Sequence, residues 1–365
     1  MNYESLLAVI TLLYLTQVGL FFYGLRIRRN SASNTAQPPV SVIVAARNEE
    51  HSIAECLASL CHQSYPRERY EVVVVDDHSE DSTREVVMNV AAREERIKLI
   101  QSVPESSLRG KTNALATGIR ESIGEIVMIT DADCTVPPTW IEETVRRYES
   151  RVGIVGGMTL QSASDWFGGM QSLDWAYLLG IASAAVGLGN PLSTIGNNLS
   201  FRREAYNQVG GYEGIPFSIT EDYSLFQAIV RTGTWNVAYP LDHALLVISK
   251  PCKSWGELVR QKHRWGKGGL DMKLSGFLIM AIGFTQHLMI LAGPLLYGAV
   301  SAALTGWFVK AVGDYAFLHA VLRRVRRLDQ LKYFLAFQIY YLLYVLALPF
   351  IVFFRRRVVW KGRSY

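Results

Sequence analysis

The chain has 365 residues, enough for one large domain or for one domain together with membrane elements. Half of its residues are hydrophobic and only 19% are charged, which argues against an ordinary soluble enzyme. The net charge of +5 comes from basic residues that cluster beside apolar segments, so we expect anionic lipid headgroups and no nucleic acid as their partner. The cysteines form no CxxC pair, which predicts reduced thiols in a cytosolic domain. They are Cys56, Cys61, Cys134 and Cys252.

The first apolar stretch covers residues 6–25, close to the roughly 20 residues that a helix needs to cross a bilayer. A cleavable signal peptide would carry positive charge before such a stretch. Here Glu4 precedes it, and Arg26, Arg28 and Arg29 follow it. Because positive residues stay on the cytoplasmic side, we expect the N-terminus outside and the chain after Arg26 inside. Residues 1–29 therefore predict a transmembrane anchor.

A polar linker at residues 30–39 leads into a region, residues 40–273, where β-branched runs alternate with helical patterns. The predicted strands are residues 40–46, 71–75, 97–100 and 125–130, and the predicted helices are residues 48–60, 82–93 and 111–122. This alternation predicts an α/β fold with a parallel sheet covered on both faces. In such sheets, ligands bind at the carboxyl ends of the strands.

Acidic residues stand at those strand ends and in one later segment. They are Asp76 and Asp77, Asp131 and Asp133, and Glu221 and Asp222. Aspartate after a strand often caps a turn or a helix, so each cluster also has an ordinary structural explanation. The middle cluster is more specific, because carboxylates at i and i+2 bring two hard oxygen ligands near one point. Mg²⁺ or Mn²⁺ bound with donor phosphates needs that arrangement.

Several common motifs are absent from the sequence. The loop after the first predicted strand contains no GxGxxG, and Gly110-Lys111-Thr112 lacks the earlier glycine of a P-loop. Cysteine and histidine show no zinc spacing, and there is no GxSxG elbow. Dinucleotide oxidoreductases and P-loop ATPases are therefore disfavoured.

Two further apolar regions bear on the membrane. Residues 164–191 are rich in aromatic residues and glycine but are interrupted by Asp165 and Asp174, which favours a buried or interface-lying helix over a second span. Residues 274–292 and 294–309 predict a hairpin that turns at Gly293 and Pro294, and residues 333–354 predict a further span.

The C-terminal region, residues 274–365, thus predicts two to three transmembrane helices. The side of its C-terminus stays open, because basic residues lie at both ends of the last predicted span. They are Arg323, Arg324, Arg326, Arg327 and Lys332 before it and Arg355–Arg357 after it.

Seven short motifs occur in the order that is typical of one enzyme family, which makes the resemblance to that family specific. They are VSVIVAARNEE, VVVVDDHSEDST, GKTNAL, ITDADC, GNNLSFRREAYNQVGGY, TEDYSL and QKHRW, within residues 40–267. The chain resembles the membrane-bound branch of the family 2 glycosyltransferases. This resemblance implies a GT-A fold, which is Rossmann-like with a mostly parallel sheet, and a nucleotide-diphosphate sugar as donor. It also implies inversion at the anomeric carbon and a divalent metal, Mg²⁺ or Mn²⁺.

The resemblance assigns the donor site residue by residue. Asp77 matches the aspartate that holds the base of the donor, and the loop ending at Glu49 lies beside the nucleotide. Lys111 matches a lysine next to the donor phosphates. Asp131 and Asp133 match the DxD pair, in which the second residue contacts the metal and the first contacts the donor sugar or ribose. The sequence Ala45-Ala46-Arg47 departs from the family pattern, which leaves the identity of the nucleotide open.

The resemblance also assigns the acceptor side. Asp222 matches the general base that deprotonates the acceptor hydroxyl, with Glu221 beside it in the acceptor site. Gln261, Arg264 and Trp265 match QxxRW, in which the arginine offers donors to the diphosphate and the tryptophan shapes the acceptor site. Residues 250–273 are also basic and aromatic enough for an interfacial helix, and both interpretations can hold together.

Three functions compete on this sequence. Transfer of one sugar to a lipid acceptor is favoured, because the C-terminal segments show few internal polar residues to line a polymer channel. A processive polysaccharide synthase is the alternative, since QxxRW also occurs in such enzymes. A non-catalytic scaffold is disfavoured by the retention of every carboxylate. We expect a multi-pass protein of the cell (inner) membrane with a cytoplasmic catalytic domain.

Overall fold

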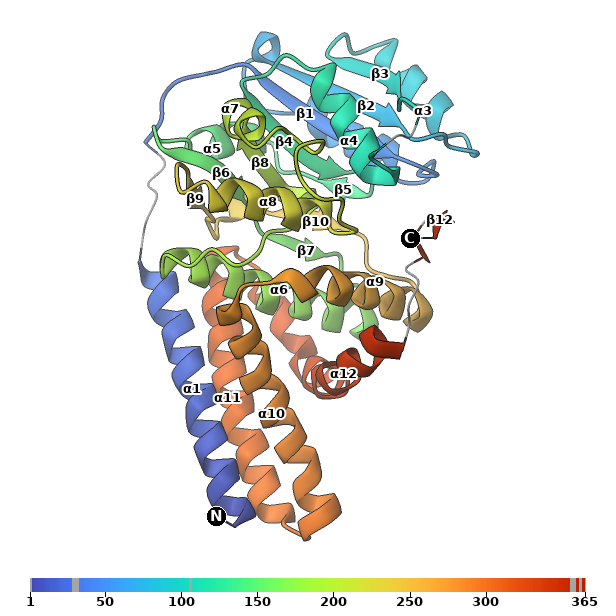
Figure 1. Cartoon of the computed structure of the whole chain (residues 1–365). Helices are drawn as coiled ribbons and strands as arrows, with labels where there is room; N and C mark the ends of the chain where they lie inside the picture. Colours follow the sequence, from blue (N-terminus) through green and yellow to red (C-terminus); the bar gives the residue numbers. More distant parts are fainter. Residues whose placement is uncertain (1, 28–32, 105–106, 355–358, 361–362, 365) are drawn as a thin grey trace.

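The computed structural model describes residues 2–27, 33–104, 107–354, 359–360 and 363–364. Arg28, Arg29 and Arg355–Arg357, which the topology prediction uses, lie outside the described residues. The α/β domain lies at one end of a bundle of long helices, and the N-terminus marks the opposite end of that bundle (Figure 1).

The main sheet has seven strands in the order β3-β2-β1-β4-β8-β6-β9. They are β1 (Val40–Ala46), β2 (Tyr70–Asp76), β3 (Ile97–Gln101), β4 (Ile126–Asp131), β6 (Val152–Gly156), β8 (Leu199–Arg202) and β9 (Asn236–Ala238). β8 runs antiparallel to β4 and β6, and the other pairs are parallel. The four predicted strands are present, and the mostly parallel sheet is confirmed. A small second sheet, β5-β10-β7, consists of Cys134–Thr135, Val247–Ser249 and Thr159–Gln161.

Helices cover both faces of the main sheet (Figure 1). They are α2 (Ile53–Cys61), α3 (Thr83–Ala91), α4 (Gly110–Arg120), α5 (Trp140–Val145), α7 (Arg203–Gln208) and α8 (Glu221–Arg231). The prediction that a helix begins at Asn48 is wrong, because α2 begins at Ile53. The backbone N–H groups of Asn48 and Glu49 donate to the hydroxyls of Ser79 and Thr83, at 3.1 and 2.7 Å, so a neighbouring loop uses these groups. Asn48 also has a φ of 53°, which is outside the helical range.

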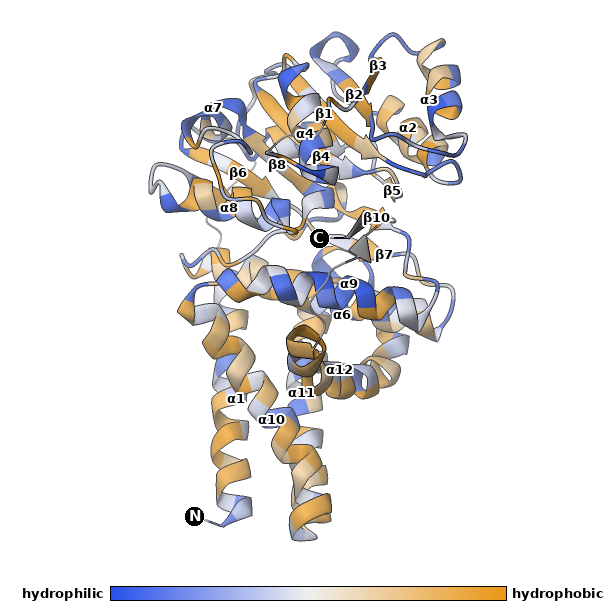
Figure 2. Cartoon of the chain, turned by 45° about the vertical axis from the view of Figure 1, so that its right-hand side comes forward, coloured by the Kyte–Doolittle hydropathy of each residue, from blue (hydrophilic) through white to orange (hydrophobic). Residues whose placement is uncertain are grey.

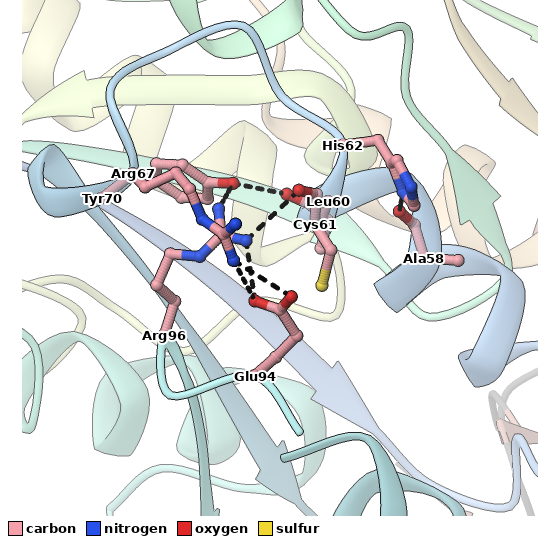
Figure 3. Close-up of polar contacts among 8 residues, drawn as sticks. All are labelled: Ala58, Leu60, Cys61, His62, Arg67, Tyr70, Glu94 and Arg96. Carbon is pink, nitrogen blue, oxygen red and sulfur yellow. Dashed lines mark hydrogen bonds and ion pairs between the residues drawn. The ribbon is translucent and has the colours of Figure 1, made fainter. Parts of the chain in front are cut away.

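A polar cluster holds the amino ends of β2 and β3 (Figure 3). The Arg96 guanidinium donates to the hydroxyl of Tyr70, to the carbonyl of Cys61 at 3.3 Å and to Glu94 at 2.7 Å. Its guanidinium carbon also lies 4.7 Å from the centre of the Tyr70 ring. Arg67 pairs with the same carboxylate at 3.2 Å. These contacts fix the end of α2 to the sheet at the amino ends of its strands. The candidate site residues Asp77 and Asp131 lie at the opposite, carboxyl ends, so the cluster has a structural role.

Three long helices, α1 (Tyr3–Arg26), α10 (Leu274–Tyr297) and α11 (Val300–Arg324), pack side by side in the bundle (Figure 1). Within the described residues, three helical segments are long and apolar enough to cross a membrane: α1, α10 and residues 328–354. The helices of the bundle consist mostly of hydrophobic residues (Figure 2), and many large hydrophobic side chains on them are exposed.

The predicted turn at Gly293 and Pro294 is wrong. α10 continues through Pro294 to Tyr297, and the chain turns at Gly298, which has a φ of +62°. A glycine in this left-handed conformation is the usual way for a helix to end, whereas proline removes only one backbone hydrogen bond from the last turn. α11 then runs back along α10 toward the α/β domain (Figure 1).

α11 carries a buried ion pair inside the bundle. Lys310 Nζ lies 2.6 Å from Asp314 Oδ2, and the same carboxylate accepts hydrogen bonds from Tyr14 of α1 and Tyr177 at 2.7 and 3.1 Å. Gln338 Nε2 donates to Asp314 at 2.8 Å. Lys310 and Asp314 lie just beyond the predicted apolar segment of residues 294–309, so the apolar pattern did not indicate this pair. These side chains bond to one another and tie together helices that are distant in the sequence.

α6 (Trp166–Gly187) lies between the α/β domain and the bundle, roughly across the bundle axis (Figure 1). Most of its residues are buried, so the segment forms a buried helix and not a second span. Its crossing with α1 needs glycine: a Cβ on Gly24 would lie 2.2 Å from the Ala184 carbonyl oxygen, and one on Gly187 would lie 2.0 Å from that of Gly24.

α12 (Phe334–Phe354) follows the short helix Leu328–Tyr333 and lies crosswise beneath α6 and α9 (Trp255–Gly268) (Figures 1 and 2). It was expected to span the membrane, but it does not extend down beside α1, α10 and α11. Tyr333, just before it, packs on Gly169 of α6, and Leu348 and Val352 pack on Gly266 of α9. Both ends of α12 therefore lie at the end of the bundle that carries the α/β domain.

Candidate active site

Lys111 brings two of the acidic clusters together. Its ammonium group lies 2.6 Å from Asp131 Oδ1 at the end of β4 and 3.2 Å from Glu221 Oε1 at the start of α8. The Lys111 side chain is 14% exposed and that of Glu221 is 7% exposed. Gly110 before the lysine has a φ of +52°, a conformation that glycine adopts without strain as the chain enters α4. The site is thus built from three elements at the carboxyl edge of the sheet.

Asp222 stands beside this ion-paired group. Its backbone follows Glu221 in the first turn of α8, and a Cβ added to Gly196 would lie 3.1 Å from the Asp222 Cβ. Burial and the charge of Glu221 raise the pKa of Asp222 to about 6, against the opposing charge of Lys111. Burial disfavours the charged form of Lys111, but Asp131 and Glu221 outweigh it and raise the pKa of Lys111. Lys111 therefore stays charged, while Asp222 titrates near neutral pH.

Asp77 lies at the same edge of the sheet, directly after β2, and β1 separates β2 from β4. Its backbone N–H donates to the carbonyl of Ala46 at the end of β1, and its Oδ1 accepts a hydrogen bond from Ser102 at 3.0 Å. The Arg47 guanidinium donates to the Asp77 carbonyl at 2.8 Å. Glu49 lies in the same loop as Arg47. Asp77 is only 2% exposed, so its carboxylate is held in place before any ligand arrives.

Asp133 follows the end of β4 and is partly exposed. Among the described residues, no three His, Cys, Asp or Glu side chains converge as a metal cage. Mg²⁺ and Mn²⁺ sites that include substrate phosphates need only one or two carboxylates, so the DxD pair fits such an ion. The carboxylates of this pair are hard oxygen ligands, which favour a hard cation.

Arg264 of α9 lines a cleft together with Lys111 and Glu221. The positive charge of Arg264 acts on Asp222 and opposes the rise in its pKa. α9 therefore brings Arg264 of the QxxRW motif to the carboxylates, from the side of the α/β domain that faces the bundle. The remaining lining residues of the cleft are Arg109, Thr112, Phe217 and Ile219.

The other two QxxRW residues are Gln261 and Trp265. Gln261 is three residues before Arg264 and four before Trp265, so it is a neighbour of both on the surface of α9. Its Oε1 is buried without a hydrogen-bond partner among the described residues. Trp265 packs on the α6 side, with its ring centre 5.3 Å from that of Trp175. The structure thus places Arg264 near the carboxylates and packs Trp265 against α6.

Sequence reasoning missed part of the cleft. Arg109 immediately precedes the Gly110-Lys111 motif, and Phe217 and Ile219 lie three residues and one residue before Thr220. The position of these three residues beside the GKTNAL and TEDYSL motifs is the sequence signal that points to them. The buried partners of α9 and α11 left no such local signal.

Two protein-family models and one solved structure match most or much of this chain. The model described as "Glycosyl transferase family 2" matches residues 41–210, and the model described as "Glycosyl transferase family group 2" matches residues 126–354, more than half of the chain. A mannosyltransferase from Pyrobaculum calidifontis, solved in complex with GDP-Man and Mn²⁺, superposes with a TM-score of 0.61 at 21% identity. That match covers 97% of this chain and 99% of the other.

Three relatives match this chain over more than 240 residues each. Glycosyltransferase AglE of Haloferax volcanii is 28% identical over 269 residues, which cover 71% of this chain and 82% of that protein. The beta-monoglucosyldiacylglycerol synthase of Trichormus variabilis is 28% identical, and the poly-beta-1,6-N-acetyl-D-glucosamine synthase of Staphylococcus epidermidis is 25% identical. Each of these two matches covers 65% of this chain, and the chain spans 50% and 56% of their lengths. From its family models, relatives and GT-A-like domain, this chain belongs to the family 2 glycosyltransferases.

Proposed function

We propose that this protein transfers one sugar, with inversion, from a nucleotide-diphosphate sugar to a lipid acceptor at the membrane surface. The observation that carries this proposal is the position of Asp222. This carboxylate stands next to the Lys111, Asp131 and Glu221 group and close enough to Arg264 for its charge to lower the pKa of Asp222. Arg264 lines a cleft with Lys111 and Glu221, and its helix rests on the apolar helix α12. A lipid hydroxyl or phosphate at headgroup level would meet the base at that side of the domain.

Asp222 acts as the general base. Its ionised carboxylate accepts the proton of the acceptor group while the acceptor oxygen attacks the anomeric carbon, and the bond from that carbon to the diphosphate breaks. The nucleoside diphosphate is the leaving group and takes the electron pair of that bond. Lys111 and Arg264 stabilise the negative charge that develops on this leaving group, since both cations line the cleft. A pKa near 6 leaves Asp222 mostly ionised at neutral pH.

The nucleotide lies over the ends of β1 and β2 in this proposal. Asp77 holds the base through a carboxylate that Ser102 already orients, and the loop of Arg47 and Glu49 flanks it. Asp131 contacts the sugar or ribose. The unpartnered Oε1 of Gln261 can accept a hydrogen bond from a hydroxyl of the acceptor or product, which would satisfy a buried polar atom.

Asp133 would hold a divalent cation, Mg²⁺ or Mn²⁺, which neutralises the diphosphate when bound. Both the mannosyltransferase structure with Mn²⁺ and the hard carboxylate oxygens of Asp131 and Asp133 support this assignment. Asp133→Ala should weaken metal-dependent donor binding, and EDTA should do the same to the unmodified protein. Titration of donor binding against Mg²⁺ and Mn²⁺ measures both effects. Full activity after thorough chelation would show that no metal takes part.

A panel of labelled nucleotide sugars tests the donor side of the proposal. Membranes that contain the protein are incubated with each donor, and release of nucleoside diphosphate is measured with and without added lipid. One donor should be consumed in a lipid-dependent way. The polysaccharide-synthase relative makes a polymer product the second candidate, which would appear as a water-soluble labelled chain.

The membrane arrangement follows from the positions of the basic residues. α1, α10 and α11 cross the membrane in this proposal, and α12 lies at its surface on the cytoplasmic side, in the cell (inner) membrane. Arg26 ends α1, and Arg323 and Arg324 end α11, all at the end of the bundle near the α/β domain. Because both ends of α12 lie there as well, positive charge at both of them fits a single cytoplasmic side.

Cysteines at the two ends of the bundle test this topology. Ser33→Cys lies in the linker, where Ser33 makes one exposed hydrogen bond to Glu149 at 3.3 Å. In intact cells it should resist an impermeant thiol reagent and react once the membrane is opened. Ala299→Cys, in the turn between α10 and α11, is the matched control and should react in intact cells. Reaction of Ser33→Cys in sealed cells would reverse the proposed topology.

A further inference from the structure

We infer that a buried ion pair between Asp174 of α6 and Lys262 of α9, completed by Tyr340 of α12, positions Arg264 for the donor. All three are positioning residues, since they act through α9. The inference rests on the proposed donor-binding role of Arg264, but the ion pair itself has no part in the proposed chemistry.

The pair is almost fully enclosed. The side chains of Lys262 and Asp174 are 3% and 4% exposed, and the ammonium group donates to Asp174 Oδ2. Tyr340 donates its hydroxyl to the same oxygen at 3.1 Å. The Lys262 ammonium also lies 4.3 Å from the centre of the Trp265 ring and 5.0 Å from that of Tyr344. One lysine of α9 therefore contacts α6 and α12 together.

Helix geometry links this pair to the active site. Successive residues of an α-helix are about 100° apart around its axis, so Lys262 and Arg264 point about 200° apart. When Lys262 is fixed toward α6, Arg264 must point away from α6, which is toward the cleft with Lys111 and Glu221. Trp265 lies three residues after Lys262 and packs on the same side, against Trp175. Rotation of α9 would break the ion pair and withdraw Arg264 at once.

Two glycines leave α9 little freedom to shift without consequence. A Cβ on Gly266 would lie 2.4 Å from Val352 of α12, and one on Gly268 would lie 2.1 Å from the hydroxyl oxygen of Thr220. Thr220 directly precedes Glu221 and Asp222. The backbone of α9 thus fits closely between a membrane-associated helix and the segment that carries the base. Displacement of α9 would disturb both the donor cleft and that segment.

A buried ion pair by itself is weak evidence for stability, because the cost of desolvating two charges offsets their attraction. Such a pair instead fixes the position of the lysine, because a buried ammonium group is stable only in contact with its carboxylate partner. The pair of Lys310 and Asp314 offers a matched comparison. It has the same two residue types, the same near-complete burial and tyrosine donors, but it lies in the bundle on α11 and not on α9.

The kinetic test compares variants of these two pairs in the full-length protein. Asp174→Asn and Lys262→Met should each raise the donor KM and lower donor kcat/KM by about 10- to 100-fold, because a misplacement of about 1 Å can cost about 100-fold. The double variant leaves no unpaired charge and should be less impaired than the product of the single effects. Tyr340→Phe, the mildest change, should raise donor KM a few-fold. Asp314→Asn should reduce the yield of folded protein but leave donor KM unchanged.

Hydrogen exchange of residues 255–268 tests the same inference without activity. Asp174→Asn and Tyr340→Phe should speed exchange in α9, whereas Asp314→Asn should not. If the unmodified protein used no nucleotide sugar, the proposed function would fail, and the exchange data would still decide whether the pair holds α9. Donor KM and α9 exchange at unmodified values in both Asp174→Asn and Tyr340→Phe would overturn the inference. The same changes in Asp314→Asn as in Asp174→Asn would also overturn it. If Asp174→Asn does not fold, Tyr340→Phe decides.

Discussion

Asp222→Asn is expected to lower the rate of sugar transfer by about 10²–10⁴-fold, the usual contribution of a general base, with nucleotide binding nearly intact. The asparagine amide has almost the same shape as the carboxylate but cannot accept a proton. Binding should survive, because Lys111 keeps its partners Asp131 and Glu221. Transfer and binding are measured separately, by labelled product and by titration with nucleoside diphosphate.

The pH profile sharpens this prediction. Burial and Glu221 raise the pKa of Asp222 to about 6, and only the ionised form can act as base. The kcat/KM of the unmodified protein should therefore fall about tenfold per pH unit below about pH 6. The residual activity of Asp222→Asn should lack this acid limb. Asp271→Asn, an exposed carboxylate near the end of α9, is the control and should behave as the unmodified protein. Near-normal turnover of Asp222→Asn would show that another group is the base.

Lys111→Met is expected to lower kcat/KM by about 10²–10³-fold, the scale seen when one stabilising donor is removed from a developing anion. The variant keeps the length of the side chain but removes the charge that stands between Asp131 and Glu221. Those two carboxylates would then repel the donor diphosphate. The effect should appear in donor KM, in kcat and in the affinity for nucleoside diphosphate.

Lys98→Met is the matched control for Lys111→Met. Lys98 also pairs with a glutamate, Glu71, at 2.5 Å, but its side chain is 49% exposed and lies on a strand away from the acidic residues. The Glu71 side chain is only 10% exposed, but it keeps hydrogen bonds from the Ser41 hydroxyl and the Ile123 N–H after Lys98 is lost. The variant should therefore fold, and its activity should stay normal. If Lys111→Met kept normal donor KM and kcat, the lysine would have no role at the diphosphate.

The sheet and the carboxylate site could be predicted from the sequence because both follow local rules. Short β-branched runs such as residues 71–75 form buried parallel strands, and parallel strands place their carboxyl ends at one edge. Asp131 and Asp222 are 91 positions apart, yet strand order and motif order place both near Lys111. The order of the motifs thus predicts which distant residues meet at the site, which the spacing between those residues does not.

The membrane part was harder to predict, because its details depend on tertiary contacts. Apolar length marks residues 333–354 as a span, but nothing local indicates that Tyr340 bonds to Asp174 and Gln338 to Asp314. Those contacts hold α12 crosswise. The ion pairs were missed for the same reason, since Lys262 and Asp174 are 88 residues apart. The direction of Trp265 likewise depends on Trp175, which no helical pattern in residues 250–273 reveals.

The fate of the labelled sugar tests the proposed function most directly. Membranes with the unmodified protein are incubated with the donor that supports turnover, and the product is divided between organic solvent and water. Asp222→Asn membranes serve as the blank. We expect label in the organic phase, with one sugar per lipid and one nucleoside diphosphate released for each. Label that appears only in water as a growing polymer, at the same level of nucleotide release, would contradict single transfer to a lipid.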